Sequence, residues 1–207
     1  MGILKTASAL LVLSVAGLAS AQIYDLHKDF TIEANPHLTW SFGSSKTVTG
    51  FEPYTNNKVV EDFYATKLQG ELNGWSRPDG VFPYAARNEG SSVLYQHWNP
   101  GDVVLSPSND LFSIVRWTNP ASRLTAVKMY VTFRRIENLT DYVSEWYILA
   151  NGKVIDYGTL SLRSEERSVT EAFDVAPGGA ISLVVGCKDH MDGTELSVNA
   201  TINAGPR

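Results

Sequence analysis

The sequence predicts an all-β fold, a single antiparallel β-sandwich of the jelly-roll type, and three observations support this prediction. Apolar and polar residues alternate along many short segments, as they do in strands with one buried face. Turn-forming residues such as Asn-Gly and Pro-Gly separate these segments where hairpins need them. No segment shows the apolar stripe of an amphipathic helix. About ten short strands without intervening helices are typical of a sandwich.

The first element, residues 1–21, is predicted to be a cleaved secretory signal peptide. Lys5 provides a positive charge, an apolar run follows, and Ala19-Ser20-Ala21 supplies the small residues that precede a cleavage site. The run is shorter than the roughly 20 apolar residues that span a bilayer, and no later stretch is long enough. We therefore expect a secreted, extracellular protein without a transmembrane segment, whose mature domain comprises residues 22–207.

The clearest predicted strand is Thr125–Arg135, where Val127, Met129, Val131 and Phe133 share one face. Further strands are predicted at 30–32, 37–42, 92–98, 103–105, 111–117, 142–149, 153–160, 168–175, 181–188 and 194–203. A hairpin is predicted at Asn151-Gly152, because both central residues of a type I′ turn need positive φ. Residues 52–88 lack the alternation and are predicted to be a loop-rich insertion packed on the sandwich.

Charge and cysteine content limit the classes of function. The net charge of −5 argues against nucleic acid and anionic membranes, which need basic patches. The single cysteine, Cys187, excludes an intrachain disulfide. Its parity with Leu183 and Val185 indicates a small buried residue, and the alternative is a thiol available for an intermolecular bond.

From about residue 30 to residue 202 the chain resembles a secreted jelly-roll domain that recurs in bacterial surface proteins, including those with PEP-CTERM sorting tails. The matching landmarks are Asn35-Pro36, Trp40-Ser41-Phe42-Gly43, Pro100-Gly101, Leu105-Ser106-Pro107, residues 114–120, residues 148–152, Ala176-Pro177-Gly178-Gly179 with Ile181, and Asp192. The resemblance implies a domain like a carbohydrate-binding module, which contacts a glycan or matrix polymer without catalysis. The chain departs from the pattern by ending at Arg207 without a sorting helix, so a cell-wall anchor is not expected.

Aromatic residues outside the predicted strands are the candidate ligand platform, because sugar C–H faces pack on flat rings while polar neighbours take the hydroxyls. The candidate binding residues are Tyr54, Trp75, Arg77, Tyr84 and Trp98. The alternative interpretation is that these rings pin the long loop onto the sandwich.

Metal, catalytic and modification sites have weaker signals. Asp189 and Asp192 offer oxygen ligands for a structural calcium ion, but two carboxylates are too few for the usual six to eight ligands. No catalytic motif is present, so we expect neither an enzyme nor a bound cofactor. Asn138 and Asn199 begin glycosylation sequons, which only a eukaryotic secretory route would use.

The sequence thus predicts a secreted, non-catalytic module that binds carbohydrate or another extracellular polymer. One alternative is a structural or adhesive matrix protein, for which self-association stays open. A second alternative is a small polysaccharide-active enzyme, which would need two positioned carboxylates in a cleft.

Overall fold

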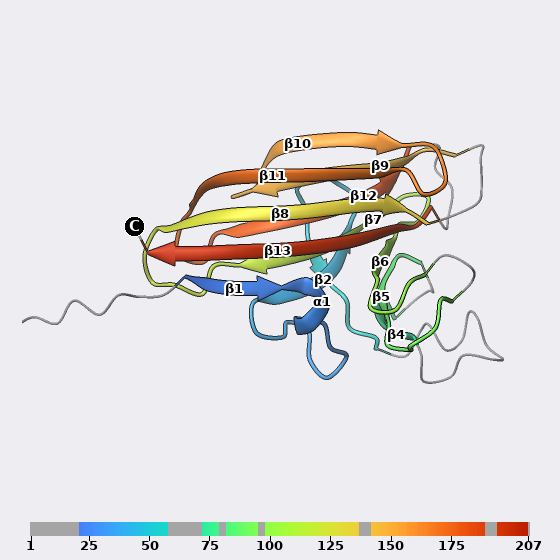
Figure 1. Ribbon diagram of the computed structural model, residues 1–207, viewed down its shortest axis with the longest axis horizontal. Helices are drawn as coiled ribbons and strands as arrows, with labels where there is room; N and C mark the ends of the chain where they lie inside the picture. The colour runs from blue at the N-terminus through green and yellow to red at the C-terminus, as the bar shows by residue number, and fades with distance from the viewer. Residues whose placement is uncertain are drawn as a thin grey trace, which may run out of the picture.

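The computed structural model describes residues 21–57, 72–78, 82–94, 98–136, 142–188 and 194–206. These residues form two antiparallel sheets packed face to face (Figure 1), which confirms the predicted β-sandwich. Helix is confined, within the described chain, to the short α1 (Leu26–Asp29), which Asp25 caps through its side chain. None of the described helices is long and apolar enough to cross a membrane.

The seven-stranded sheet has the order β11-β8-β13-β6-β5-β4, and β1 pairs with the far part of β13. Its strands are β1 (Gln22–Asp25), β4 (Leu72–Ser76), β5 (Tyr84–Asn88), β6 (Val103–Ser106), β8 (Thr125–Arg135), β11 (Glu166–Val175) and β13 (Leu196–Pro206). The six-stranded sheet has the order β10-β9-β12-β7-β2-β3. Its strands are β2 (Trp40–Ser45), β3 (Glu52–Pro53), β7 (Phe112–Thr118), β9 (Ser144–Ala150), β10 (Lys153–Leu160) and β12 (Ala180–Cys187).

The strands from β6 to β13 have jelly-roll topology. Along the chain they alternate between the sheets except at the β9–β10 hairpin, and they give the spatial orders β6-β13-β8-β11 and β7-β12-β9-β10. The hairpin turns at Asn151-Gly152 with positive φ at both residues, as predicted.

The strands with the clearest alternation are confirmed. β8 occupies the predicted range, and its residues Val127, Met129, Val131 and Phe133 lie in the core while Lys128 and Tyr130 are exposed. The core between the sheets also contains Trp40, Trp117 and Trp146, and the last of these stacks on Phe133 with ring centroids 4.9 Å apart. Aromatic rings therefore fill much of the space between the two sheets.

Three expectations about elements are wrong. Residues 30–32 form no strand. Of the second stretch, the described residues 92–94 and 98 form no strand either, and only an isolated bridge joins Leu94 and Trp98. Residues 52–88 are not only loops, because they contain β3, β4 and β5, and β4–β5 extends the seven-stranded sheet beyond β6. Most residues of β4 and β5 are buried on both faces, which removes the alternation that marks a half-exposed strand.

Candidate functional site

The structure buries the rings that the sequence offered as a ligand platform. Tyr54, Tyr84 and Trp98 are each 1% exposed and Trp75 is 6% exposed. Sugar stacking needs an open ring face, so the expectation that these rings form a surface platform is corrected. The sequence placed Trp75 in a loop, but it lies in β4 and donates its Nε1–H to the carbonyl of Thr31 at 2.7 Å.

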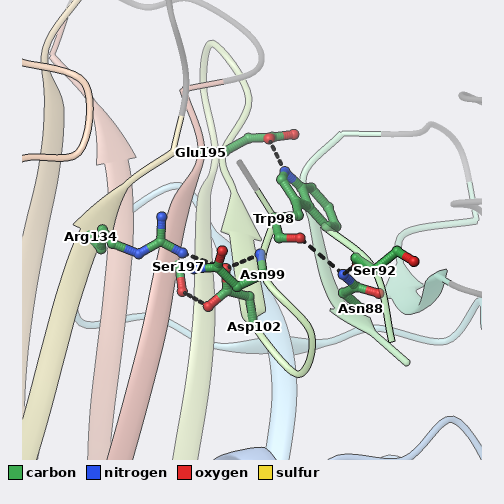
Figure 2. Close-up of polar contacts among 8 residues, drawn as sticks. All are labelled: Asn88, Ser92, Trp98, Asn99, Asp102, Arg134, Glu195 and Ser197. Atoms are coloured by element: carbon green, nitrogen blue, oxygen red, sulfur yellow. Dashed lines mark hydrogen bonds and ion pairs between the residues drawn. The ribbon is translucent and has the colours of Figure 1, made fainter. Parts of the chain in front are cut away.

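Trp98 and Tyr84 instead hold a buried carboxylate, that of Glu195, just before β13. Trp98 Nε1 donates to Glu195 Oε2 at 3.0 Å, and the Tyr84 hydroxyl donates to Glu195 Oε1 (Figure 2 shows the tryptophan contact). A buried carboxylate needs such donors to offset its lost hydration. These contacts join Tyr84 of β5 and Trp98, ahead of β6, to the segment before β13. For Tyr84 this agrees with the alternative that aromatic rings pin residues 52–88 onto the sandwich.

Asp102 is a second buried carboxylate in the same region (Figure 2). It accepts hydrogen bonds from the backbone N–H of Asn99 at 2.7 Å and the hydroxyl of Ser197 at 2.8 Å, and it pairs with Arg134. The Asn88 amide adds bonds to the carbonyls of Ser92 and Trp98, each at 2.9 Å. These contacts join the segment before β6 to β8 and β13, and their role is structural.

The remaining predicted binding residues also have structural partners. The Tyr54 hydroxyl donates to Ser113 Oγ at 3.1 Å, and burial raises the pKa of this phenol well above its usual range. Arg77 forms an ion pair with Glu52 at 3.1 Å, which links the end of β4 to β3. The five predicted residues do not converge on one surface.

A pocket that the sequence did not indicate lies at one end of the six-stranded sheet, where β7 and β9 begin and β12 ends. Its cavity volume is about 370 Å³. Its wall is formed by Lys46, Ser108, Asn109, Asp110, Leu111, Phe112, Glu145, Gly186, Cys187 and Lys188.

A glycine, Gly186, forms part of the pocket wall. Gly186 lies between Phe112 of β7 and Glu145 of β9, and a Cβ atom at this position would overlap the Phe112 ring. The ring therefore lies over the glycine backbone and reaches the ring of Tyr147, to which it packs edge-on at 6.0 Å. Without a side chain at residue 186, the sheet has room for the ring next to the pocket.

Two tyrosines continue this aromatic row away from the pocket. Tyr147 of β9 and Tyr157 of β10 are cross-strand partners, with stacked rings 6.1 Å apart. Tyr157 is 70% exposed, whereas Tyr147 is half-buried against Ile114, Leu149 and Val184 on the outer face of the sheet. We call Phe112, Tyr147 and Tyr157 the aromatic row.

Glu145 of the pocket contacts the aromatic row. The hydroxyl of Tyr147 donates to Glu145 Oε2 at 3.2 Å. Burial of Tyr147, with the negative charge of Glu145, raises the pKa of the phenol above its usual value, so it stays a neutral donor at neutral pH. The site thus combines ring faces with a carboxylate that accepts hydrogen bonds.

Among the residues that the structure describes, four charged side chains line the pocket: Lys46, Asp110, Glu145 and Lys188. No ion pair within 4.0 Å joins any two of them. Both signs of charge therefore line the same space without direct contact between them.

Comparisons with known proteins leave the family open. No protein-family model matches the chain, and no curated protein matches it. Among solved structures, a family 35 carbohydrate-binding module from Clostridium thermocellum is similar at 10% identity and a TM-score of 0.34, covering 53% of this chain and 83% of the module.

A family 11 carbohydrate-binding module from a cellulosomal cellulase of the same organism is similar at 12% identity and a TM-score of 0.33, covering 91% of this chain and 96% of the module. An isomalto-dextranase of Arthrobacter globiformis is similar at 8% identity and a TM-score of 0.30, covering 92% of this chain and 30% of the enzyme. At such low TM-scores a shared ligand or activity does not follow. The resemblance to PEP-CTERM-type surface proteins stays a prediction.

The other predicted sites have mixed outcomes. Asn138, Asp189 and Asp192 lie outside the described residues, as do residues 1–20 of the predicted signal peptide. Within the described part, no group of three or more His, Cys, Asp or Glu side chains could hold a metal ion. Asn199 is exposed on the outer face of β13, as its parity predicts. Cys187 is partly exposed at the pocket rather than fully buried, because it ends β12.

Proposed function

We propose that this protein is a secreted, non-catalytic module that binds carbohydrate at the aromatic row and the adjoining pocket. One observation carries the proposal: the exposed ring of Tyr157 stacks on Tyr147 next to a pocket with polar and charged walls. An apolar ring face with nearby hydrogen-bonding groups suits a sugar, whose C–H face is apolar and whose edge bears hydroxyls. The predicted export signal supports a ligand outside the cell.

The affinity expected for one site is modest. A sugar stacked on one ring face buries about 50 Å² of apolar surface, which is about 1 kcal/mol at about 25 cal/mol per Å². A millimolar dissociation constant corresponds to about 4 kcal/mol, so one stacked ring binds a short ligand more weakly than this unless hydrogen bonds in the pocket supply the difference. A repetitive polymer that offers many sites is therefore the favoured class of ligand.

Affinity electrophoresis with a matched pair of tyrosine variants tests the proposal. Polysaccharides in native gels should retard the wild-type protein, and Tyr157→Ala should abolish the retardation. Tyr130→Ala is the control, because Tyr130 is also partly exposed but lies on the outer face of the other sheet. Thermal melts should show both variants folded. Retardation of Tyr157→Ala equal to that of the wild type would refute the proposed site.

Assembly through sheet edges, the structural alternative, is disfavoured by the two long edge strands. β10 contains a bulge, and Asp156 lies opposite the core residue Ile148. On β11, Arg167 and Glu171 lie opposite the core residues Phe133 and Met129. Inward charges and bulges at edges oppose pairing with another copy. Size-exclusion chromatography should therefore find no concentration-dependent assembly.

The enzymatic alternative has a specific test, because Asp110 and Glu145 line the same pocket. Hydrolysis of a glycoside needs two such groups in set positions. The proposal expects no release of reducing ends from any polysaccharide that the protein binds. Release that disappears in Glu145→Gln would contradict a non-catalytic role.

A further inference from the structure

The four charges around the pocket bear on the chemical class of the polymer, an inference that rests on the proposed function. Lys46 follows β2 and Lys188 follows β12, so two separate elements bring ammonium groups to one cavity. Neither lysine forms an ion pair with Asp110 or Glu145. Both lysine side chains are exposed at the pocket and accessible to a ligand.

The carboxylates and the lysines of the pocket favour different chemical groups on a sugar. Glu145 and Asp110 accept hydrogen bonds, and any sugar has hydroxyls that donate them. The lysine ammonium groups only donate, and their hydrogen bonds are strongest when the acceptor carries a negative charge. The carboxylates of the pocket therefore accept most sugars, whereas the two lysines favour an acidic one.

The net charge of the molecule does not favour an acidic ligand, so any such preference must come from cations near the binding site. The chain has a net charge of −5, so its surface as a whole does not attract a polyanion. Attraction must come from cations within about one Debye length, roughly 10 Å, of the bound sugar. Among the described residues of the pocket, Lys46 and Lys188 are the cations, and they outweigh Asp110 and Glu145 for a sugar carboxylate that lies nearer to the lysines.

We propose that the pocket binds the carboxylate of a uronic acid, so that the ligand is a uronate-containing polysaccharide. The sugar carboxylate lies between Lys46 and Lys188, its hydroxyls donate to Glu145 and Asp110, and a neighbouring sugar of the same chain packs on Tyr157. In this arrangement the lysines, the carboxylates and the aromatic row of the site each contact the ligand.

The test compares two forms of one polymer that differ in charge. Polygalacturonate and its highly methyl-esterified form have the same backbone, and esterification removes the carboxylate charge. Native gels with polygalacturonate should retard the wild type more strongly than gels with the ester. Lys46→Gln and Lys188→Gln should each weaken binding to the acidic form by about two- to fivefold, the size expected for one exposed ion pair. Lys128→Gln, at an exposed lysine on β8 of the other sheet, should have no effect.

Alginate and hyaluronate extend the test to other uronates, and each outcome has a distinct meaning. Equal retardation by the charged and esterified forms overturns the uronate inference, as does an unchanged affinity in both pocket-lysine variants. A lack of retardation by all three uronate polymers also overturns it. In each of these cases, binding of a neutral polysaccharide that is lost in Tyr157→Ala would leave the proposed function intact.

Discussion

Tyr147 links the two halves of the candidate site. Its ring stacks on the exposed ring of Tyr157, and its hydroxyl donates to the carboxylate of Glu145 in the pocket. Loss of hydration and the nearby negative charge both oppose ionisation of the phenol, so its pKa is raised. One residue therefore orients the pocket carboxylate and supports the ring that a ligand would contact.

The raised pKa of Tyr147 gives a prediction about pH. An ultraviolet titration of wild type minus Tyr147→Phe should show a phenol that ionises above the usual range. Glu145→Gln should lower this pKa, because the substitution removes the negative charge while burial remains. A titration curve that does not change in Glu145→Gln would mean that the carboxylate does not act on the phenol.

At the scale of the strand, a single bulge in β10 sets the aromatic row. Next to the hairpin, Lys153 pairs with Ala150 and Val154 with Leu149. An uninterrupted register would then place Asp156 opposite Tyr147 and turn Tyr157 toward the core. The bulge between Val154 and Asp156 shifts the register by one residue, so that Tyr157 pairs with Tyr147 on the outer face.

The faces of β8 give a prediction about stability. Val131 is buried between Val169 and Ala200, so Val131→Asp places an unpaired carboxylate in the core at a cost of several kcal/mol. Thr132 lies on the outer face beside Ser168, and Thr132→Asp should cost less than about 1 kcal/mol. Urea melts measure both effects. Equal midpoints for the two variants would mean that the faces of the strand are assigned wrongly.

The sequence predicted the strands that carry an alternating or a continuous apolar pattern, including the covered strands β6 and β12, but it missed β4 and β5, whose polar and small residues break the pattern. β8 and β10 have the predicted bounds, and in β8 this follows from a clear alternation, because one face lies in the core and the other is open to water. β4 and β5 have no such contrast, and the bulge in β10 leaves no mark in the pattern of apolar residues. Trp98 has polar neighbours in sequence, but its partner Glu195 is 97 residues away. The sequence therefore could not show that Trp98 is buried against Glu195, and the aromatic row and the pocket became visible only in the folded structure.

In the whole molecule, the two outer faces have different chemistry. The outer face of the six-stranded sheet contains the aromatic row and ends at the pocket. The outer face of the seven-stranded sheet contains Asn199 beside Thr132, in a row with Ser168. A glycan on Asn199 would cover this second face and leave the first face open.

Glycosylation of Asn199 is accordingly predicted to be compatible with ligand binding. Secretion from yeast cells should give a protein whose mass falls on treatment with an N-glycosidase. In an Asn138→Gln background, which leaves one sequon, Asn199→Gln should abolish this change, and both forms should bind polysaccharide equally. Absence of a glycan in the Asn138→Gln protein would show that this sequon is not used. A gain in binding on glycan removal would place the ligand on the glycosylated face.

The pairing of β1 with the far end of β13 has a consequence for attachment. Gln22 lies opposite Ala204, so both ends of the folded domain leave from one side of the sandwich (Figure 1). On this side Pro206 pairs with Thr125, and Asn119, just after β7, bonds to the carbonyl of Val175. The pocket lies where β7 begins, at the opposite pole. Any neighbouring domain or support joined through either terminus would therefore act as a tether behind the binding pole, and a fusion partner could be placed at either end without obstructing it.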